Sequence, residues 1–334
     1  LHSRVLKTPL RMLSLDDFVN ASIPLLVLER VTTGDINLWE FTPLAVGPTS
    51  VLNVDDWCLY TVGHEDGVPT LRKGQGINPP PDLDERGVTV GSCIYFLGST
   101  PSSWDVYHRD TGEWSQCAPD DGPTEDEFIQ SIIPQDGKIL VATEYVSDET
   151  SVQHTCRMWL FDTDRDTWQR VADPPIDPDT EEQVLPNHPV AVGDSVLYTN
   201  VYGVKETPEP VHSFSLTRGW EVEEGCNAPS SVWGGIYITL QNSTLFVGYS
   251  KEELPEGVFA IGYFDAASGE FTQCCHTDFE CRGVQLSHDR CLLGIVRDDQ
   301  DTDELYLVHI DHGRLQESGG IPTAEQFGVV ESHH

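Results

Sequence analysis

The chain has 334 residues, enough to bury a large core, and 38% of them are hydrophobic, which excludes wholesale disorder. Its 55 Asp and Glu residues outnumber 19 Lys and Arg, giving a formal net charge of -36. Such a surface repels the phosphates of nucleic acids and anionic membranes, so we expect neither as a partner. Its 28 glycines and 22 prolines are spread along the chain, which favours many short strands and turns.

The first predicted elements lie in the N-terminal quarter, where the pattern is least regular. Residues 1–22 are expected to form a separate segment before a domain that spans 23–332. A strand from one terminus is needed to complete a closed all-β fold, and the two candidates are 11–15 and 327–330.

Two hairpins are predicted next. Apolar stretches at 25–29 and 36–41 would form the first, and 50–62 would form the second around the turn Asp55–Asp56.

From residue 88 onward a regular repeat follows. Each unit contains a hairpin with a Gly, Asp or Asn turn, and then a second hairpin whose last strand opens with a bulky apolar side chain. These anchors recur about every 50 residues, a period typical of repeat architectures, and they are Trp114, Trp168, Trp220, Phe271 and Leu315. We expect each anchor to fill the space between neighbouring repeat units.

Two hairpins per unit make four antiparallel strands. The sequence therefore predicts an all-β chain folded as a single β-propeller of four-stranded antiparallel blades. Counting each unit separately gives seven blades, and merging the first two gives six.

The repeat resembles the kelch repeat, in which a Tyr in the third strand precedes a Trp that opens the fourth. The matching residues are Tyr107 with Trp114, Phe214 with Trp220, and Trp168. The glycine doublet of that repeat is absent, and single glycines stand near its place at Gly98, Gly248 and Gly294. The resemblance implies a protein-binding scaffold, in many relatives a substrate receptor of a ubiquitin ligase, and in a minority an enzyme of the galactose oxidase type.

Acidic residues gather in the expected loops between second and third strands, and aromatic residues stand at the edges of these loops. Loops of one charge sign around aromatic anchors suit a basic protein or peptide. The candidate partner-binding residues are Trp104, Tyr145, Glu149, Tyr202, Tyr249, Glu253, Asp298 and Asp301.

Catalytic, metal and cofactor motifs are not evident. Cys274 and Cys275 are adjacent, so a strand would point them to opposite faces and away from one ion. The acidic stretch 298–304 lacks the Gly and the final Glu of a calcium loop. We therefore expect no cofactor and no metal, and a non-catalytic role. The alternative is a propeller enzyme or carbohydrate-binding module with its site at the central funnel.

Nine cysteines are scattered through the chain, several within apolar strands. This pattern favours buried free thiols in a reducing compartment, and so a cytoplasmic or nuclear location.

Overall fold

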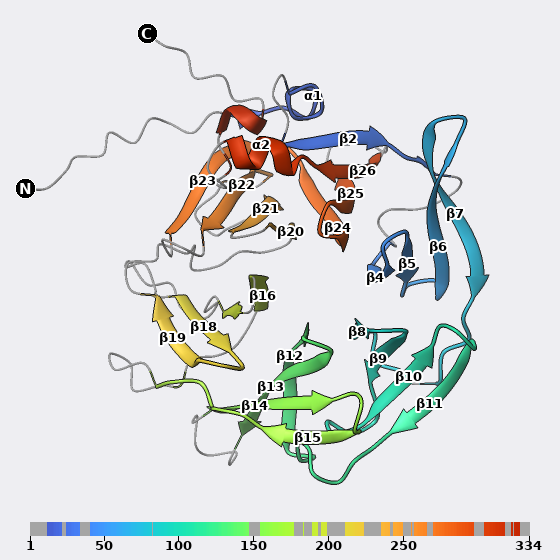
Figure 1. Ribbon diagram of the computed structural model, residues 1–334, viewed down its shortest axis with the longest axis vertical. Coiled ribbons are helices and arrows are strands. Elements are labelled where there is room, and N and C mark those ends of the chain that lie inside the picture. The colour runs from blue at the N-terminus through green and yellow to red at the C-terminus, as the bar shows by residue number, and fades with distance from the viewer. Residues whose placement is uncertain are drawn as a thin grey trace, which may run out of the picture. The chain divides into compact units, whose positions relative to one another are not determined.

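The protein is described here by a computed structural model. The residues that the structure describes are 12–21, 25–33, 41–81, 83–146, 154–176, 183, 189–192, 195–198, 211–223, 235–240, 243–249, 255, 257–265, 270–296, 304–317, 322 and 324–327. Within them β-strand is the main secondary structure, and the strands form six sheets (Figure 1).

Three sheets come from the first half of the chain, and their strands are given in spatial order. The first contains β3 (Thr32–Thr33), β7 (Val68–Gly76), β6 (Cys58–Glu65), β5 (Ser50–Asn53) and β4 (Pro43–Gly47). The second contains β11 (Glu113–Cys117), β10 (Trp104–His108), β9 (Cys93–Leu97) and β8 (Gly87–Val90). The third contains β12 (Glu127–Gln135), β13 (Lys138–Val146), β14 (His154–Asp162) and β15 (Thr167–Arg170).

The other three sheets follow. The fourth contains β16 (Pro189–Val192), β17 (Ser195–Tyr198), β18 (Val211–Ser215) and β19 (Gly219–Glu223). The fifth contains β1 (Met12–Leu13), β23 (Glu270–Thr277), β22 (Phe259–Asp265), β21 (Ser243–Tyr249) and β20 (Ile236–Thr239). The sixth contains β2 (Leu26–Arg30), β26 (Glu304–Ile310), β25 (Arg290–Val296) and β24 (Glu280–Ser287). Short helices occur at α1 (Leu15–Val19), α2 (His312–Glu317) and a 3-10 turn at Ala324–Phe327.

Six successive sheets of this kind are the blades of a β-propeller, which confirms the predicted all-β propeller fold. The predicted count of seven blades is wrong. Residues 25–29 were expected to begin a first blade, but Leu26–Arg30 instead pairs antiparallel with β26, with Leu26 opposite Ile310. The N-terminal strand is thus the outer strand of the last sheet. A strand has the same residue pattern whether it pairs with the next strand in the chain or with a strand near the other end. The sequence of 25–29 therefore does not identify its partner.

The strand that joins the two ends of the chain in the sixth sheet is β2. Within 11–15, β1 pairs in parallel with β23 as an additional edge strand. Residue Phe327 lies in the 3-10 turn, and 328–330 are outside the described residues. A third short strand, β3, pairs in parallel with β7. The stretch 12–33 therefore supplies an edge strand to three different sheets.

The chain forms two compact units. One contains Leu1–Phe41, Val62–Arg72 and Val232–His334, and the other contains Thr42–Thr61 and Lys73–Ser231. The core of the first unit includes the buried residues Leu15 and Phe18 of α1, and the Phe18 ring lies 5.5 Å from that of Phe279. The side chain of Ser14 caps α1 by accepting a hydrogen bond from the Asp17 amide. The N-terminal segment is therefore part of this core.

The second unit shows what the repeated tryptophans do. Trp114, Trp168 and Trp220 are each the second residue of the outer strand of their sheet, and each contacts the preceding sheet. Trp114 lies 6.4 Å from Trp57, Trp168 donates a hydrogen bond to the Ser102 carbonyl at 2.9 Å, and Trp220 donates to the Ala172 carbonyl at 2.8 Å. Trp168 also stacks on Trp104. The expectation that these anchors fill the space between neighbouring units is met in these three sheets.

A pair of substitutions tests the hydrogen-bond part of this packing. Replacing Trp168 by Phe removes the donor to Ser102 and is expected to lower the free energy of unfolding by about 1–3 kcal/mol. Replacing Trp114 by Phe should cost less, because its buried indole N–H has no acceptor among the described residues. Urea unfolding of both variants checks the order. An equal or greater loss for Trp114→Phe would show that ring volume alone matters at these positions.

Candidate functional site

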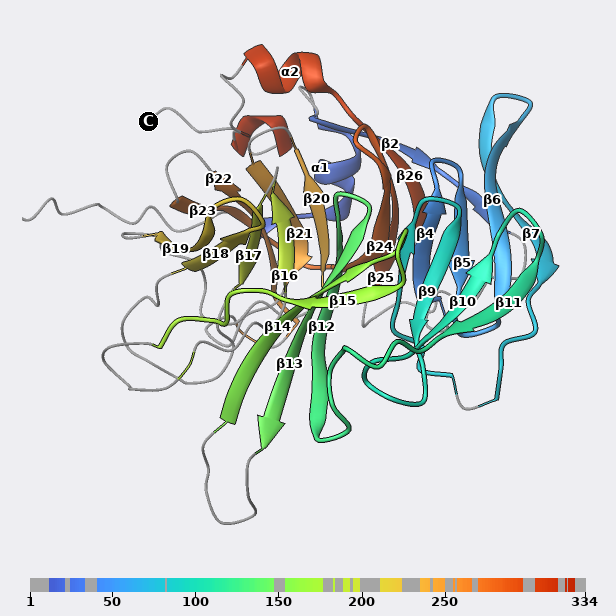
Figure 2. The ribbon, with the colours of Figure 1, turned by 60° about the horizontal axis from the view of Figure 1, so that its bottom comes forward.

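One end of the third sheet combines an ordered charged network with an exposed aromatic residue. Strand β12 begins at Glu127, and β13 and β14 are joined by 147–153, which lies outside the described residues. Glu127 is opposite Tyr145 in the strand register, and Tyr145 is opposite Thr155. This end of β12–β14 is visible in Figure 2. It is the position where the sequence predicts a partner-binding loop.

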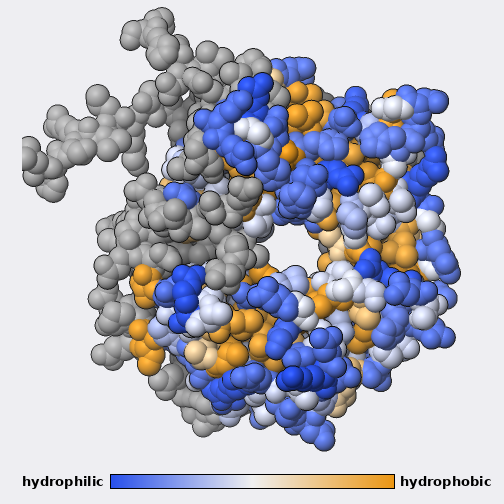
Figure 3. All heavy atoms as spheres, viewed as in Figure 1, coloured by the Kyte–Doolittle hydropathy of each residue, from blue (hydrophilic) through white to orange (hydrophobic). Residues whose placement is uncertain are grey.

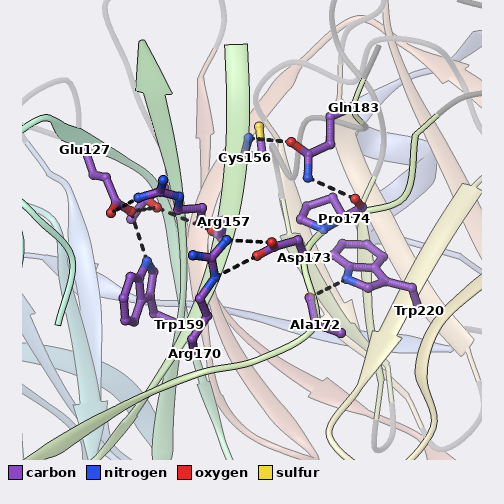
Figure 4. A network of polar contacts seen from close by, with 11 residues as sticks. Glu127, Cys156, Arg157, Trp159, Arg170, Ala172, Asp173, Pro174, Gln183 and Trp220 are labelled. Atoms are coloured by element: carbon purple, nitrogen blue, oxygen red, sulfur yellow. Dashed lines mark hydrogen bonds and ion pairs between the residues drawn. The ribbon is translucent and has the colours of Figure 1, made fainter. Parts of the chain in front are cut away.

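Glu127 is the centre of the network. Glu127 is only 1% exposed, although its side chain is a carboxylate. It lies on the face of the third sheet that packs against the second sheet, β8–β11. Its Oε2 accepts hydrogen bonds from Thr143 Oγ1 at 2.5 Å and from Trp159 Nε1 at 3.0 Å, and its Oε1 lies 2.7 Å from Arg157 Nη1 (Figure 4). The three donors come from β13 and β14. A single carboxylate therefore ties the ends of three strands together.

The network also keeps Glu127 charged. Burial alone would raise the pKa of this carboxyl group, because removal from water disfavours the ionised form. Hydrogen bonds from Thr143, Trp159 and Arg157 more than offset burial, and the pKa of Glu127 is lowered from its usual value. The group is consequently a fixed anion at neutral pH and not a proton donor or acceptor.

Cations and aromatic rings alternate beside this carboxylate. The Arg157 guanidinium lies over the Tyr145 ring at 4.9 Å from its centroid, and Arg170 lies 6.0 Å from the centroid of Trp159. Arg170 is held in turn by Asp173, with Nη2–Oδ2 at 2.6 Å (Figure 4). The contact with Arg157 holds the half-buried Tyr145 side chain beside the network.

The opposite face of the same strand ends carries the exposed aromatic residue. Phe128 is 62% exposed, and its cross-strand neighbour Glu144 accepts a hydrogen bond from Gln130. Glu125 and Asp126, immediately before the strand, are exposed. A large apolar ring with a carboxylate opposite it and two acidic residues just before its strand is suited to contact a ligand that is both apolar and cationic. Figure 3 shows hydrophilic and hydrophobic side chains intermingled on the described part of one face of the molecule.

The predicted partner-binding residues divide into three groups. Tyr145 lies at the site. Trp104 and Tyr249 are 0% and 1% exposed, so neither presents its ring at the surface as expected of an aromatic anchor. Trp104 packs against Trp168 of the third sheet, and Tyr249 packs against Phe246 and Phe271 of its own sheet. The remaining five lie outside the described residues: Glu149, Tyr202, Glu253, Asp298 and Asp301.

Phe128 was missed as a site residue because it opens an apolar stretch that predicts a buried strand. The available signal is alternation. Phe128 and Gln130 share one face, whereas Ile129 packs against the core on the other. An aromatic residue that shares a strand face with a glutamine and with the exposed Asp126 is a sign of a solvent-facing position.

The cysteine cluster considered for metal binding is part of the core. Cys274, Cys275 and Cys281 are free and buried, and burial raises the pKa of the Cys275 thiol to about 12. Within the described ranges, no group of three His, Cys, Asp or Glu side chains is arranged to hold a metal ion.

Two further findings concern the chain as a whole. The helices among the described residues are too short to cross a bilayer. When the chain is compared with protein-family models and with curated protein sequences, nothing matches it. The kelch resemblance therefore stays a prediction from the repeat itself.

Proposed function

We propose that this chain is a non-catalytic protein-binding scaffold, or recognition subunit, that engages a basic protein or peptide segment. The β-propeller fold commonly presents its loops to partners, although the fold by itself does not determine function. The net charge of -36 favours a cationic partner through long-range attraction. A substrate receptor of a ubiquitin ligase, in the cytoplasm or nucleus, is the form of this role that the kelch-like repeat suggests.

The observation that carries the proposal is the exposure of Phe128. An aromatic ring 62% exposed in a strand loses most of the stabilisation that burial would provide. Aromatic residues supply much of the energy at protein interfaces, where a partner removes them from water. The carboxylates of Glu125 and Asp126 beside it favour a partner with Lys or Arg next to its own apolar residue.

The Glu127 network supports the proposal in a second way. A surface that is already ordered before binding loses little conformational entropy when the partner arrives. The hydrogen bonds and ion pair at Glu127 hold the backbone that carries Phe128, the next residue in β12. The ring is thus presented from a fixed strand.

The test uses synthetic peptides, some basic with one aromatic or aliphatic residue and others neutral or acidic, with binding measured by fluorescence anisotropy at low and raised salt. The wild type should bind only the basic set, and more weakly as salt screens the charges. Phe128→Ala is expected to weaken binding about tenfold, the effect of losing one interface anchor. Val68→Ala is the matched control, because Val68 is also an exposed apolar strand residue, in another sheet.

The electrostatic part has its own control. Replacing Glu125 and Asp126 by Gln and Asn should weaken binding and reduce its salt dependence. The same loss of charge at Asp110 and Glu113, exposed residues of the second sheet, should have little effect. If both pairs weaken binding equally, the attraction is general to the acidic surface. If Phe128→Ala binds every peptide as the wild type does, this site is not the interface.

A further inference from the structure

Cys93 differs from every other cysteine that the structure describes. Six of the eight are buried, and only Cys93 and Cys117 are partly accessible. Burial, with Asp166 nearby, raises the pKa of the Cys117 thiol to about 12, so this thiol is protonated at neutral pH. Cys93 instead faces a base.

That base is His108, which lies directly opposite Cys93 in the register of β9 and β10. The Cys93 Sγ is 3.3 Å from His108 Nδ1, and His108 Nε2 is 2.7 Å from the Ser115 Oγ of β11. The three side chains form a row across β9, β10 and β11, in which Cys93 and His108 are half-buried and Ser115 is exposed. Cys93 also packs against the buried cluster between the second and third sheets. The pairing of β9, β10 and β11 sets the positions of these three residues, and no loop contributes to the row.

The order of the three groups matches their chemical roles. A hydroxyl that accepts the Nε2–H of the imidazole leaves the Nδ1 lone pair directed at the cysteine. Nδ1 can then take the thiol proton, which leaves a thiolate beside an imidazolium. A nucleophile, a base in contact with it and a third group that orients the base are the elements of an activated thiol.

We propose that Cys93 is a reactive thiol that forms mixed disulfides with small disulfides. The Cys93 thiolate attacks one sulfur of R–S–S–R, a new S–S bond forms to Cys93, and the bond between the two original sulfurs breaks. The departing thiolate takes the proton that His108 received. One thiol and one disulfide are consumed, and one thiol and one disulfide are produced, so no other oxidant is required. A thiol reverses the reaction.

The experiment incubates the full chain with glutathione disulfide at pH 7 and follows each cysteine peptide by mass spectrometry. Modification at Cys93 is expected to be about tenfold faster than at Cys117, because the thiolate is the attacking species. His108→Gln should slow Cys93 about tenfold and leave Cys117 unchanged. In guanidinium, wild type and His108→Gln should react equally, since the contact is lost on unfolding.

Ser115 is a positioning residue, and two substitutions isolate its role. Ser115→Ala should slow modification of Cys93, and Ser115→Thr, which keeps the hydroxyl, should restore it. A rate at Cys93 no greater than that at Cys117, or a rate unaffected by His108→Gln in the folded protein, would overturn the proposal. Thermal unfolding of each variant identifies any change that comes from loss of the fold.

Discussion

Replacing Glu127 by alanine is expected to lower the free energy of unfolding by about 3–5 kcal/mol, the typical loss when one partner of a buried ion pair is removed. The change leaves the indole N–H of Trp159 and the hydroxyl of Thr143 without their acceptor and deprives Arg157 of its carboxylate. Urea unfolding at pH 7 measures the loss. Asp126→Ala is the matched control, because Asp126 is the preceding residue and is exposed.

The effect should depend on pH in a defined direction. The pKa of Glu127 in the folded protein is below its usual value, so the carboxylate contributes stability above the pKa of the unfolded chain, about 4.3. This contribution disappears as the pH falls through the lower, folded pKa. The stability difference between wild type and Glu127→Gln should therefore shrink as the pH is reduced from 7 towards 3. A difference that is constant across this range would mean that packing, and not charge, stabilises the site.

Removing the N-terminal segment up to residue 33 is expected to abolish folding of the first compact unit. Five residues of this segment are fully or almost fully buried in its core: Leu13, Leu15, Phe18, Leu25 and Leu26. Burial of each contributes about 1.5–3 kcal/mol, and together they approach the whole stability of an ordinary domain, about 5–15 kcal/mol. The truncation also leaves the edge of β26 unpaired, which favours aggregation.

Circular dichroism and size-exclusion chromatography of the truncated chain measure this loss. A synthetic peptide of residues 12–33 added in trans should restore the folded species, because it carries all three edge strands and α1. A peptide with Leu26 and Phe18 replaced by Asp should not. If the truncated chain is monomeric and folded without any peptide, the segment is an accessory and the sixth sheet is stable with three strands.

The sequence by itself determined the features that depend on neighbouring residues. Turn residues such as those at Gly91–Ser92 specify a hairpin whatever the rest of the chain does, and β8 and β9 pair there as predicted. The recurring tryptophans marked the outer strands, because a large ring at a fixed period needs a repeated space to fill. Both kinds of signal are local, so the all-β propeller could be predicted from them.

Only the tertiary structure decided which distant segments meet. Pairing of Leu26 with Ile310 joins the two ends of the chain, and this pairing changed the blade count from seven to six. The ion pair between Glu127 and Arg157, and the contact of Cys93 with His108, each depend on the register of neighbouring strands. A shift of one residue would turn either side chain to the other face of its sheet. Residue type indicates what a side chain can do, and register decides whether it has a partner.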